Sequence, residues 1–180
     1  AVLAGLARDP LLMASARPVL SLPVGAELQR APVREALRDV VGERMNDDTL
    51  DKVVRNVSSS WAQAGHLRGR TFKFRQRVQA KPAAVAFALW LGQASGFRGD
   101  ELLTCGWIAV LDCTASSARS LAVEAKRVGL IEFRSGGDVI EFGLERLDPG
   151  IGRVCRHGAN RSPRGSLWPA HLNALAAHRR

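Results

Sequence analysis

The sequence predicts a mainly α-helical protein with small β-ribbons, on three observations. Apolar residues recur at helical spacing in several segments bounded by glycine and proline. Two segments of alternating character each follow a helix that ends at a glycine. The order helix, helix, glycine, ribbon occurs twice, over about residues 30–80 and 82–144. The two copies match in element order but not residue by residue.

Residues 1–28 form an apolar N-terminal helical segment interrupted by prolines. We expect two short helices flanking Pro10 and then an extended piece through Ser21, Leu22 and Pro23.

A first module is expected over residues 29–81. Pro32 suits the first turn of a helix that Gly42 ends. The apolar face of this helix comprises Val33, Leu37, Val40 and Val41.

A second helix of this module begins after Asn46 or Asp47, either of which can cap it, and stops at Gly65. Its buried stripe comprises Leu50, Val53, Val54, Val57, Trp61 and Ala64. Its opposite face carries Lys52, Arg55, Asn56, Ser59 and Gln63.

The segment 66–81 alternates between aromatic and basic residues, which predicts a β-ribbon. It contains six Lys and Arg residues and no acid. Five of these cations repel one another unless a partner neutralises them, which indicates phosphate contact. They are Arg68, Arg70, Lys73, Arg75 and Arg77.

A second module is expected over residues 82–147. Pro82 opens an apolar helix that ends between Gly92 and Gly96, and the segment DELLTCGWIAVLD (100–112) predicts one further helix. Asp112 or Thr114 can cap the next helix, which spans residues 116–128. A hairpin follows, with its turn at residues 135–138.

The helix at 116–128 has a small apolar face and a hydroxyl-rich face. The apolar face comprises Ala118, Leu121, Ala122, Ala125 and Val128. The opposite face includes Ser116, Ser117, Arg119 and Ser120. Short polar side chains let a helix backbone approach a DNA major groove, and an arginine can bind guanine through two hydrogen bonds.

The charge of the chain indicates a polyanionic partner. Its 180 residues contain 26 Lys and Arg against 17 Asp and Glu, a net charge of +9. Nucleic acid is the first expectation and an acidic membrane surface the second. A basic protein that is merely soluble is the alternative. We expect residues 148–180 to form a basic tail, because 146–180 contain seven arginines and one acid.

The cysteines predict neither a disulfide framework nor a zinc site. Their number is odd, and no C-x₂-C or H-x₃-H pair accompanies Cys105, Cys113 or Cys155. No signal peptide and no apolar run long enough to span a bilayer are evident, so we expect a cytoplasmic protein.

No catalytic motif frames the nucleophiles and acids of the chain, so we expect no enzyme activity, no cofactor and no small-molecule substrate. Asp47, Asp48 and Asp51 are explained as helix-terminal acids rather than a nuclease site. We expect Trp61, Trp90 and Trp107 in the core, whereas Trp168 lies in the tail.

The segment AKRVGLIEF (125–133), followed by a glycine turn and VIEFGL (139–144), resembles the join between recognition helix and wing in winged helix-turn-helix domains. The resemblance covers residues 82–144, and residues 30–80 look like a less typical copy with GHLRGRTFKFRQRV (65–78) as its wing. It implies tandem winged-helix modules that bind double-stranded DNA. The recognition helices would present Lys52, Arg55, Asn56 and Ser59 in the first module, and Ser116, Ser117, Arg119 and Ser120 in the second.

The second wing departs from a DNA-binding pattern because it carries Glu132, Asp138 and Glu141 beside Arg134. We therefore expect the first ribbon to make the phosphate contacts, with the helix at 116–128 contributing readout or protein contact.

The segment VSSSWAQAGHLRGR (57–70) also resembles uncharacterised bacterial proteins of phage-defence loci of the BREX type. That resemblance implies a DNA-binding regulator or accessory factor in antiviral defence. The alternative is an adaptor that docks a protein partner through winged helices, and RNA binding ranks third. A homodimer is compatible with either.

Overall fold

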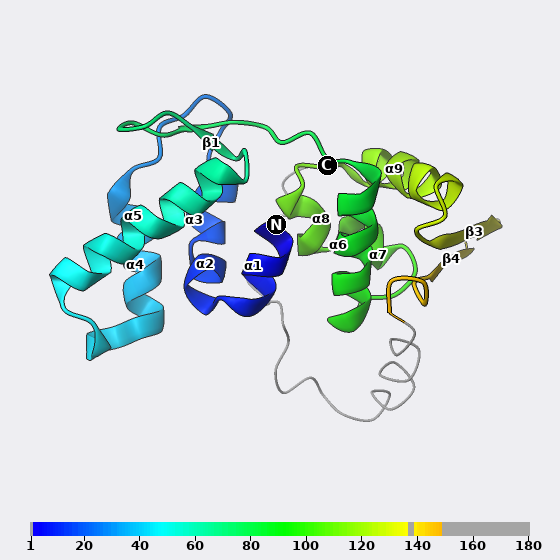
Figure 1. Ribbon diagram of the computed structural model, residues 1–180, viewed down its shortest axis with the longest axis horizontal. Coiled ribbons are helices and arrows are strands. Elements are labelled where there is room, and N and C mark those ends of the chain that lie inside the picture. The colour runs from blue at the N-terminus through cyan, green and yellow to red at the C-terminus, as the bar shows by residue number, and fades with distance from the viewer. Residues whose placement is uncertain (1, 137–138, 149–180) are drawn as a thin grey trace. The chain divides into compact units, whose positions relative to one another are not determined.

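The computed structural model describes residues 2–136 and 139–148. Contacts group the chain into two compact units, residues 1–78 and 79–180, and each is described by itself (Figure 1). The mainly α-helical class with small two-stranded ribbons is confirmed. Among the described residues, no helix is long and apolar enough to cross a membrane.

The first unit consists of short helices, two longer helices and one ribbon. The helices are α1 (Val2–Arg8), α2 (Pro10–Ala14), α3 (Ala16–Leu20), α4 (Arg30–Val41), the 3₁₀ turn η1 (Gly42–Arg44) and α5 (Asp47–Gln63). The strands are β1 (Leu67–Arg68) and β2 (Phe74–Arg75), which pair antiparallel with Leu67 opposite Arg75.

The N-terminal segment packs within this unit, with α2 against both α4 and α5. Helices α1 and α2 confirm the expected pair flanking Pro10. Helix α3 was not expected, because Pro18 lies inside it. Pro18 is the third residue of α3, where its missing N–H would have no partner within the helix, so the proline is tolerated.

Helices α4 and α5 lie side by side and supply much of the core of this unit (Figure 1). Asn46 caps α5 as expected, since its Oδ1 accepts the backbone N–H of Thr49 at 2.9 Å. The indole N–H of Trp61 donates to Ser15 Oγ at 2.8 Å and ties α5 to the junction of α2 and α3. The expectation for Val40 was wrong, because its side chain is 41% exposed while its α4 neighbour Val41 is buried.

Residues 25–28 are extended and pair with the β2 side of the ribbon. Glu27 forms a bridge with Phe74, and the N–H of Leu28 donates to the carbonyl of Lys73 at 2.7 Å. Arg75 and Ala26 are joined by a further backbone hydrogen bond of 2.8 Å. The ribbon is therefore fastened to the chain that enters α4.

The second unit contains α6 (Pro82–Ala94), α7 (Glu101–Thr104), α8 (Gly106–Val110), α9 (Ala115–Arg127), β3 (Glu132–Gly136) and β4 (Val139–Gly143). The single helix expected over residues 100–112 was wrong. The backbone of Cys105 is extended (φ −67°, ψ 162°), and this residue separates α7 from α8. Gly106, a poor helix former, then begins α8.

Helix α9 begins and ends where the sequence predicts. Thr114 Oγ1 accepts the N–H of Ser117 at 3.2 Å, and Gly129 follows the helix with φ +77°. Its alanine face is fully buried, which lets α9 pack closely on α6. Val128 is an exception to the expected face, since it lies beyond the last helical residue and is 62% exposed.

The expected hairpin is confirmed, with β3 and β4 antiparallel and Glu132 opposite Gly143. Its loop residues 137–138 lie outside the described residues, as do Trp168 and the tail from residue 149. Trp61 and Trp107 are fully buried as expected, and Trp90 is half-buried.

Candidate nucleic-acid interface

Positive charge is distributed unevenly along the chain. Residues 1–78 contain thirteen Lys and Arg against eight Asp and Glu, a net charge of +5. Residues 79–148 contain seven against nine, a net charge of −2, and residues 149–180 contain six arginines and no acid. Among the residues that the structure describes, the excess of positive charge therefore lies in the first unit.

Three segments of the first unit enclose a hollow of about 400 Å³, which we call the basic hollow. The segments are the start of α4, the middle of α5 and the turn between β1 and β2. Its lining comprises Leu28, Gln29, Arg30, Val54, Arg55, Ser58, Ser59, Arg70, Thr71 and Lys73.

Local structure explains how the cations reach the hollow. Arg30 is the first residue of α4. Arg55 and Ser59 stand one helical turn apart on α5 and so share a face. The hydrogen bond between Leu28 and Lys73 holds the ribbon against the entry to α4, and this places Lys73 beside Arg30 along the lining.

The start of α4 adds to the positive potential of the basic hollow. Gln29 is the N-cap of α4, but its side chain forms no capping hydrogen bond. The first N–H groups of a helix point outward and favour a bound anion. The helix terminus and the cations therefore act in the same direction on any anion in the hollow.

The basic hollow contains no compensating acid among the described residues that line it. Two carboxylates at the start of α5 are engaged elsewhere. Asp47 pairs with Arg34 at 2.7 Å and also with Arg38, and Asp51 pairs with Arg34 at 3.2 Å. In the described part of the chain, no ion pair joins Arg30, Arg55, Arg70 or Lys73 to a carboxylate.

Four residues predicted from sequence meet in the basic hollow: Arg55, Ser59, Arg70 and Lys73. Four others are exposed on the same unit but do not line it, and these are Lys52, Asn56, Arg68 and Arg77. Sequence reasoning missed Arg30, Gln29 and Thr71. The signal for Arg30 was its position at the start of a helix opened by Pro32, where an anion is favoured.

Arg75 does not lie on the surface with the other ribbon cations. Its residue is 2% exposed, and its Nη1 donates to the backbone carbonyls of Gln76 and, at 3.4 Å, of His66. A guanidinium enclosed in this way positions the ribbon and has no access to an external phosphate. We therefore leave Arg75 out of the candidate interface.

The predicted face of α9 in the second unit is exposed throughout, at Ser116, Ser117, Arg119 and Ser120. Arg119 Nη2 donates to Ser135 Oγ of β3 at 3.3 Å, and Ser120 Oγ donates to the carbonyl of Ser116 at 3.1 Å. The first bond connects the helix to its own hairpin, the second lies within α9, and the hydroxyl-rich surface stays accessible.

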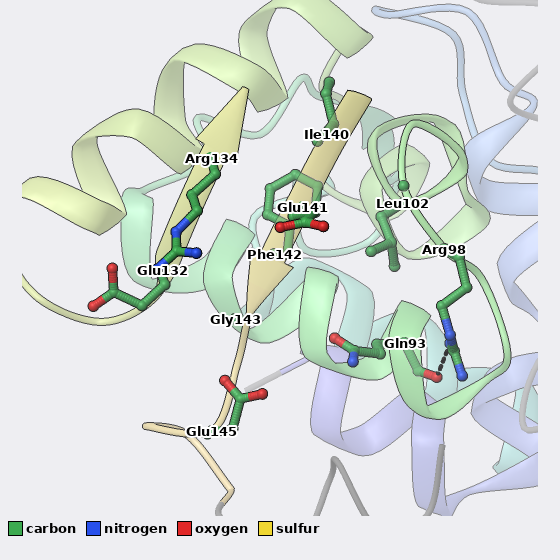
Figure 2. A pocket seen from close by; sticks show the side chains of 11 residues that line it. Gln93, Arg98, Leu102, Glu132, Arg134, Ile140, Glu141, Phe142, Gly143 and Glu145 are labelled. Carbon is green, nitrogen blue, oxygen red and sulfur yellow. Dashed lines mark hydrogen bonds between the residues drawn. The ribbon is translucent and has the colours of Figure 1, made fainter. Parts of the chain in front are cut away.

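A second hollow, of about 440 Å³, lies between the β3–β4 hairpin and the loop after α6 (Figure 2). Three carboxylates line it, from Glu132, Glu141 and Glu145, together with Arg98 and Arg134. Two of the side chains that line this hollow form an ion pair or a hydrogen bond. Glu132 pairs with Arg146 at 3.0 Å, and Arg98 donates to the backbone carbonyl of Gln93 at 2.9 Å.

No metal-binding cluster of His, Cys, Asp or Glu occurs among the described residues, and Cys155 and His157 lie outside them. Burial raises the pKa of the Cys105 thiol. Desolvation, followed by the charge of Asp112, raises the pKa of Cys113. Both thiols are thereby kept in the unreactive protonated form.

The geometry defines a hollow lined by cations on a small helical unit with a ribbon. In comparisons with protein-family models, with curated proteins and with solved structures, this chain gave no match.

Proposed function

We propose that the protein is a non-catalytic double-stranded DNA-binding protein and that its first unit grips the phosphate backbone. The observation that carries this proposal is the basic hollow. Four cations from three separate segments converge there without an acid among the described lining residues. DNA offers closely spaced phosphates, and a protein that neutralises them gains affinity by releasing counterions.

The order of elements supports tandem winged-helix modules. The first unit has helices, an extended segment that pairs with the ribbon, the helices α4 and α5, and then the ribbon itself. The second unit has α6, the pair α8 and α9 joined by a four-residue turn, and the β3–β4 hairpin. In a helix-turn-helix module the second helix of the pair enters the major groove.

The two units then contribute differently to binding. Arg30, Arg55, Arg70 and Lys73 contact phosphates, which sets affinity and register but carries no sequence information. The exposed hydroxyls and Arg119 on α9 approach base edges in the major groove.

The salt dependence of duplex binding tests this proposal. We expect a steep loss of affinity with salt for the full chain. Arg55→Ala and Arg70→Ala should each lower the log–log slope by about 0.9, because each removes one phosphate contact. Fluorescence anisotropy with a labelled duplex at several salt concentrations measures both quantities.

The matched control is Arg8→Ala, which removes one exposed cation of the same unit outside the basic hollow. Its slope should stay at the wild-type value. If all three variants lower the slope equally, the charge of the unit acts diffusely and the basic hollow has no special part in binding.

A second candidate function rests on the second unit. Its residues 79–148 carry a net charge of −2, and three glutamates line its hollow. Such a surface repels DNA and attracts a cationic protein segment. In this alternative the protein is an adaptor within a larger complex. The same titration separates the two, because an adaptor would show no duplex binding even at low salt.

A further inference from the structure

Phe72 is a large apolar side chain held in solvent beside the basic hollow. It lies in the turn between β1 and β2 and is 63% exposed, while its neighbours Thr71 and Lys73 line the hollow. Burial of a phenylalanine side chain stabilises a fold, so leaving one exposed at this place forgoes a stabilising contact.

The turn that carries Phe72 is tightly built. Gly69 has φ +105°, and a Cβ added there would lie 2.0 Å from the carbonyl oxygen of Phe72. The chain therefore closes on itself between these residues, and only glycine allows the approach. Lys73, the residue after Phe72, is also held in place, because its carbonyl accepts the N–H of Leu28 at 2.7 Å.

The buried guanidinium of Arg75 anchors the opposite end of the same ribbon, through its bonds to the carbonyls of His66 and Gln76. Phe72 thus projects from an anchored turn and loses little conformational freedom when it meets a partner.

We propose that Phe72 is a wedge that enters a base step through the minor groove of the duplex whose phosphates occupy the basic hollow. This inference rests on the proposed function and deepens it. An exposed aromatic side chain beside phosphate-binding cations matches a duplex, in which the edges of stacked base pairs lie in the groove between the phosphate backbones. Apolar side chains that insert between base steps unstack them and kink the duplex by about 20–90°. The first unit therefore bends DNA, most readily at pyrimidine–purine steps, which unstack easily.

The test compares a fully paired duplex with one that carries two adjacent mismatches at its centre, using the full chain. Mismatched bases are already poorly stacked, so inserting Phe72 beside them requires less free energy for unstacking. Wild-type protein should bind the mismatched duplex at least about tenfold more tightly, because the mismatches remove part of the cost of unstacking a step. Phe72→Ala should bind both duplexes with equal affinity. A duplex that carries a donor dye at one end and an acceptor dye at the other should show increased fluorescence energy transfer when wild-type protein bends it. Phe72→Ala should cause no such increase.

The matched control is Val24→Ala, which truncates another exposed apolar side chain of the first unit, 64% exposed and outside the lining of the basic hollow. It should preserve both the mismatch preference and the bend. Because Phe72 is exposed, Phe72→Ala should also keep the wild-type unfolding midpoint and the wild-type salt slope.

Several results would overturn the wedge. Duplex binding with no mismatch preference and no change in energy transfer rules it out while leaving the proposed function intact. A bend that survives in Phe72→Ala rules it out equally. Tighter, Phe72-dependent binding of single-stranded DNA than of either duplex would assign Phe72 to base stacking on an unpaired strand. An absence of any duplex binding would remove the proposed function and the wedge together.

Discussion

The guanidinium of Arg75 lies beneath the ribbon and satisfies backbone carbonyls there, in the same short segment whose other cations face solvent. A hydrogen bond from a charged donor contributes about 1.5–3 kcal/mol, and its removal leaves buried acceptors without a partner. Arg75 therefore acts on the stability of the ribbon rather than on ligand contact.

We expect Arg75→Ala to lower the free energy of unfolding by about 2–4 kcal/mol, since it removes these bonds and opens a buried space. Urea denaturation followed by tryptophan fluorescence measures the change. Arg77→Ala, two residues along and exposed, is the matched control and should change stability by less than about 0.5 kcal/mol. Equal stability of the two variants would contradict the structural role assigned to Arg75.

The burial of individual side chains was the hardest feature to predict from the sequence. Phe72 and Arg75 sit in one alternating pattern, and the usual interpretation places the aromatic inside and the cation outside. The structure reverses both, with Phe72 exposed and Arg75 buried. The reversal comes from the tight turn at Gly69 and from the pairing of residues 25–28 with β2, and neither is encoded in local periodicity.

At the scale of elements, helix boundaries followed local chemistry and were largely predictable. Asn46 and Thr114 begin α5 and α9, and Gly42, Gly65 and Gly129 follow helices with positive φ. A cap works through atoms within a few residues, so the sequence contains its signal. The break at Cys105 was missed even though Gly106, a poor helix former, follows it, because the apolar residues on either side continue the helical pattern.

We expect Asn46→Ala to destabilise the first unit by about 1 kcal/mol, because the N–H of Thr49 loses its acceptor at the start of α5. Asn46→Asp keeps an acceptor at the same place and should restore most of that stability. Thermal unfolding monitored by circular dichroism compares the variants. If Asn46→Asp were as unstable as Asn46→Ala, the side-chain cap would not be the cause.

The candidate site was predictable only in part, for a reason that also belongs to this scale. Arg55 and Ser59 share one face of α5, which helical spacing reveals. Arg30 joins them because α4 packs against α5, and Lys73 joins them because the ribbon pairs with the chain before α4. A contact between segments distant in sequence depends on tertiary pairing, so sequence periodicity could not show which cations would meet.

At the scale of the whole molecule, the described parts of the two units differ in charge. The net charge of +5 lies on the first unit, and the described body of the second carries more acids than bases. Nonspecific attraction to DNA is set by such charge distributions.

We therefore expect residues 1–78, prepared as a separate chain, to fold cooperatively and to bind duplex DNA with a measurable salt slope. Residues 79–148 should fold without binding duplex at low salt. Circular dichroism establishes folding, and anisotropy titrations establish binding. Strong duplex binding by residues 79–148 would show that the face of α9, and not the basic hollow, dominates affinity.

The pairing of residues 25–28 with β2 joins the beginning of α4 to the ribbon across the basic hollow. An anion bound in the basic hollow would stabilise the folded first unit, because it would neutralise like charges that three segments of the chain hold close together. A ligand that binds the folded state alone raises its stability, and at a hundred times its dissociation constant the gain is about 2.7 kcal/mol. Short polyanions without any base, such as polyphosphate, should then protect this half of the protein against heat more than equal ionic strength of chloride does.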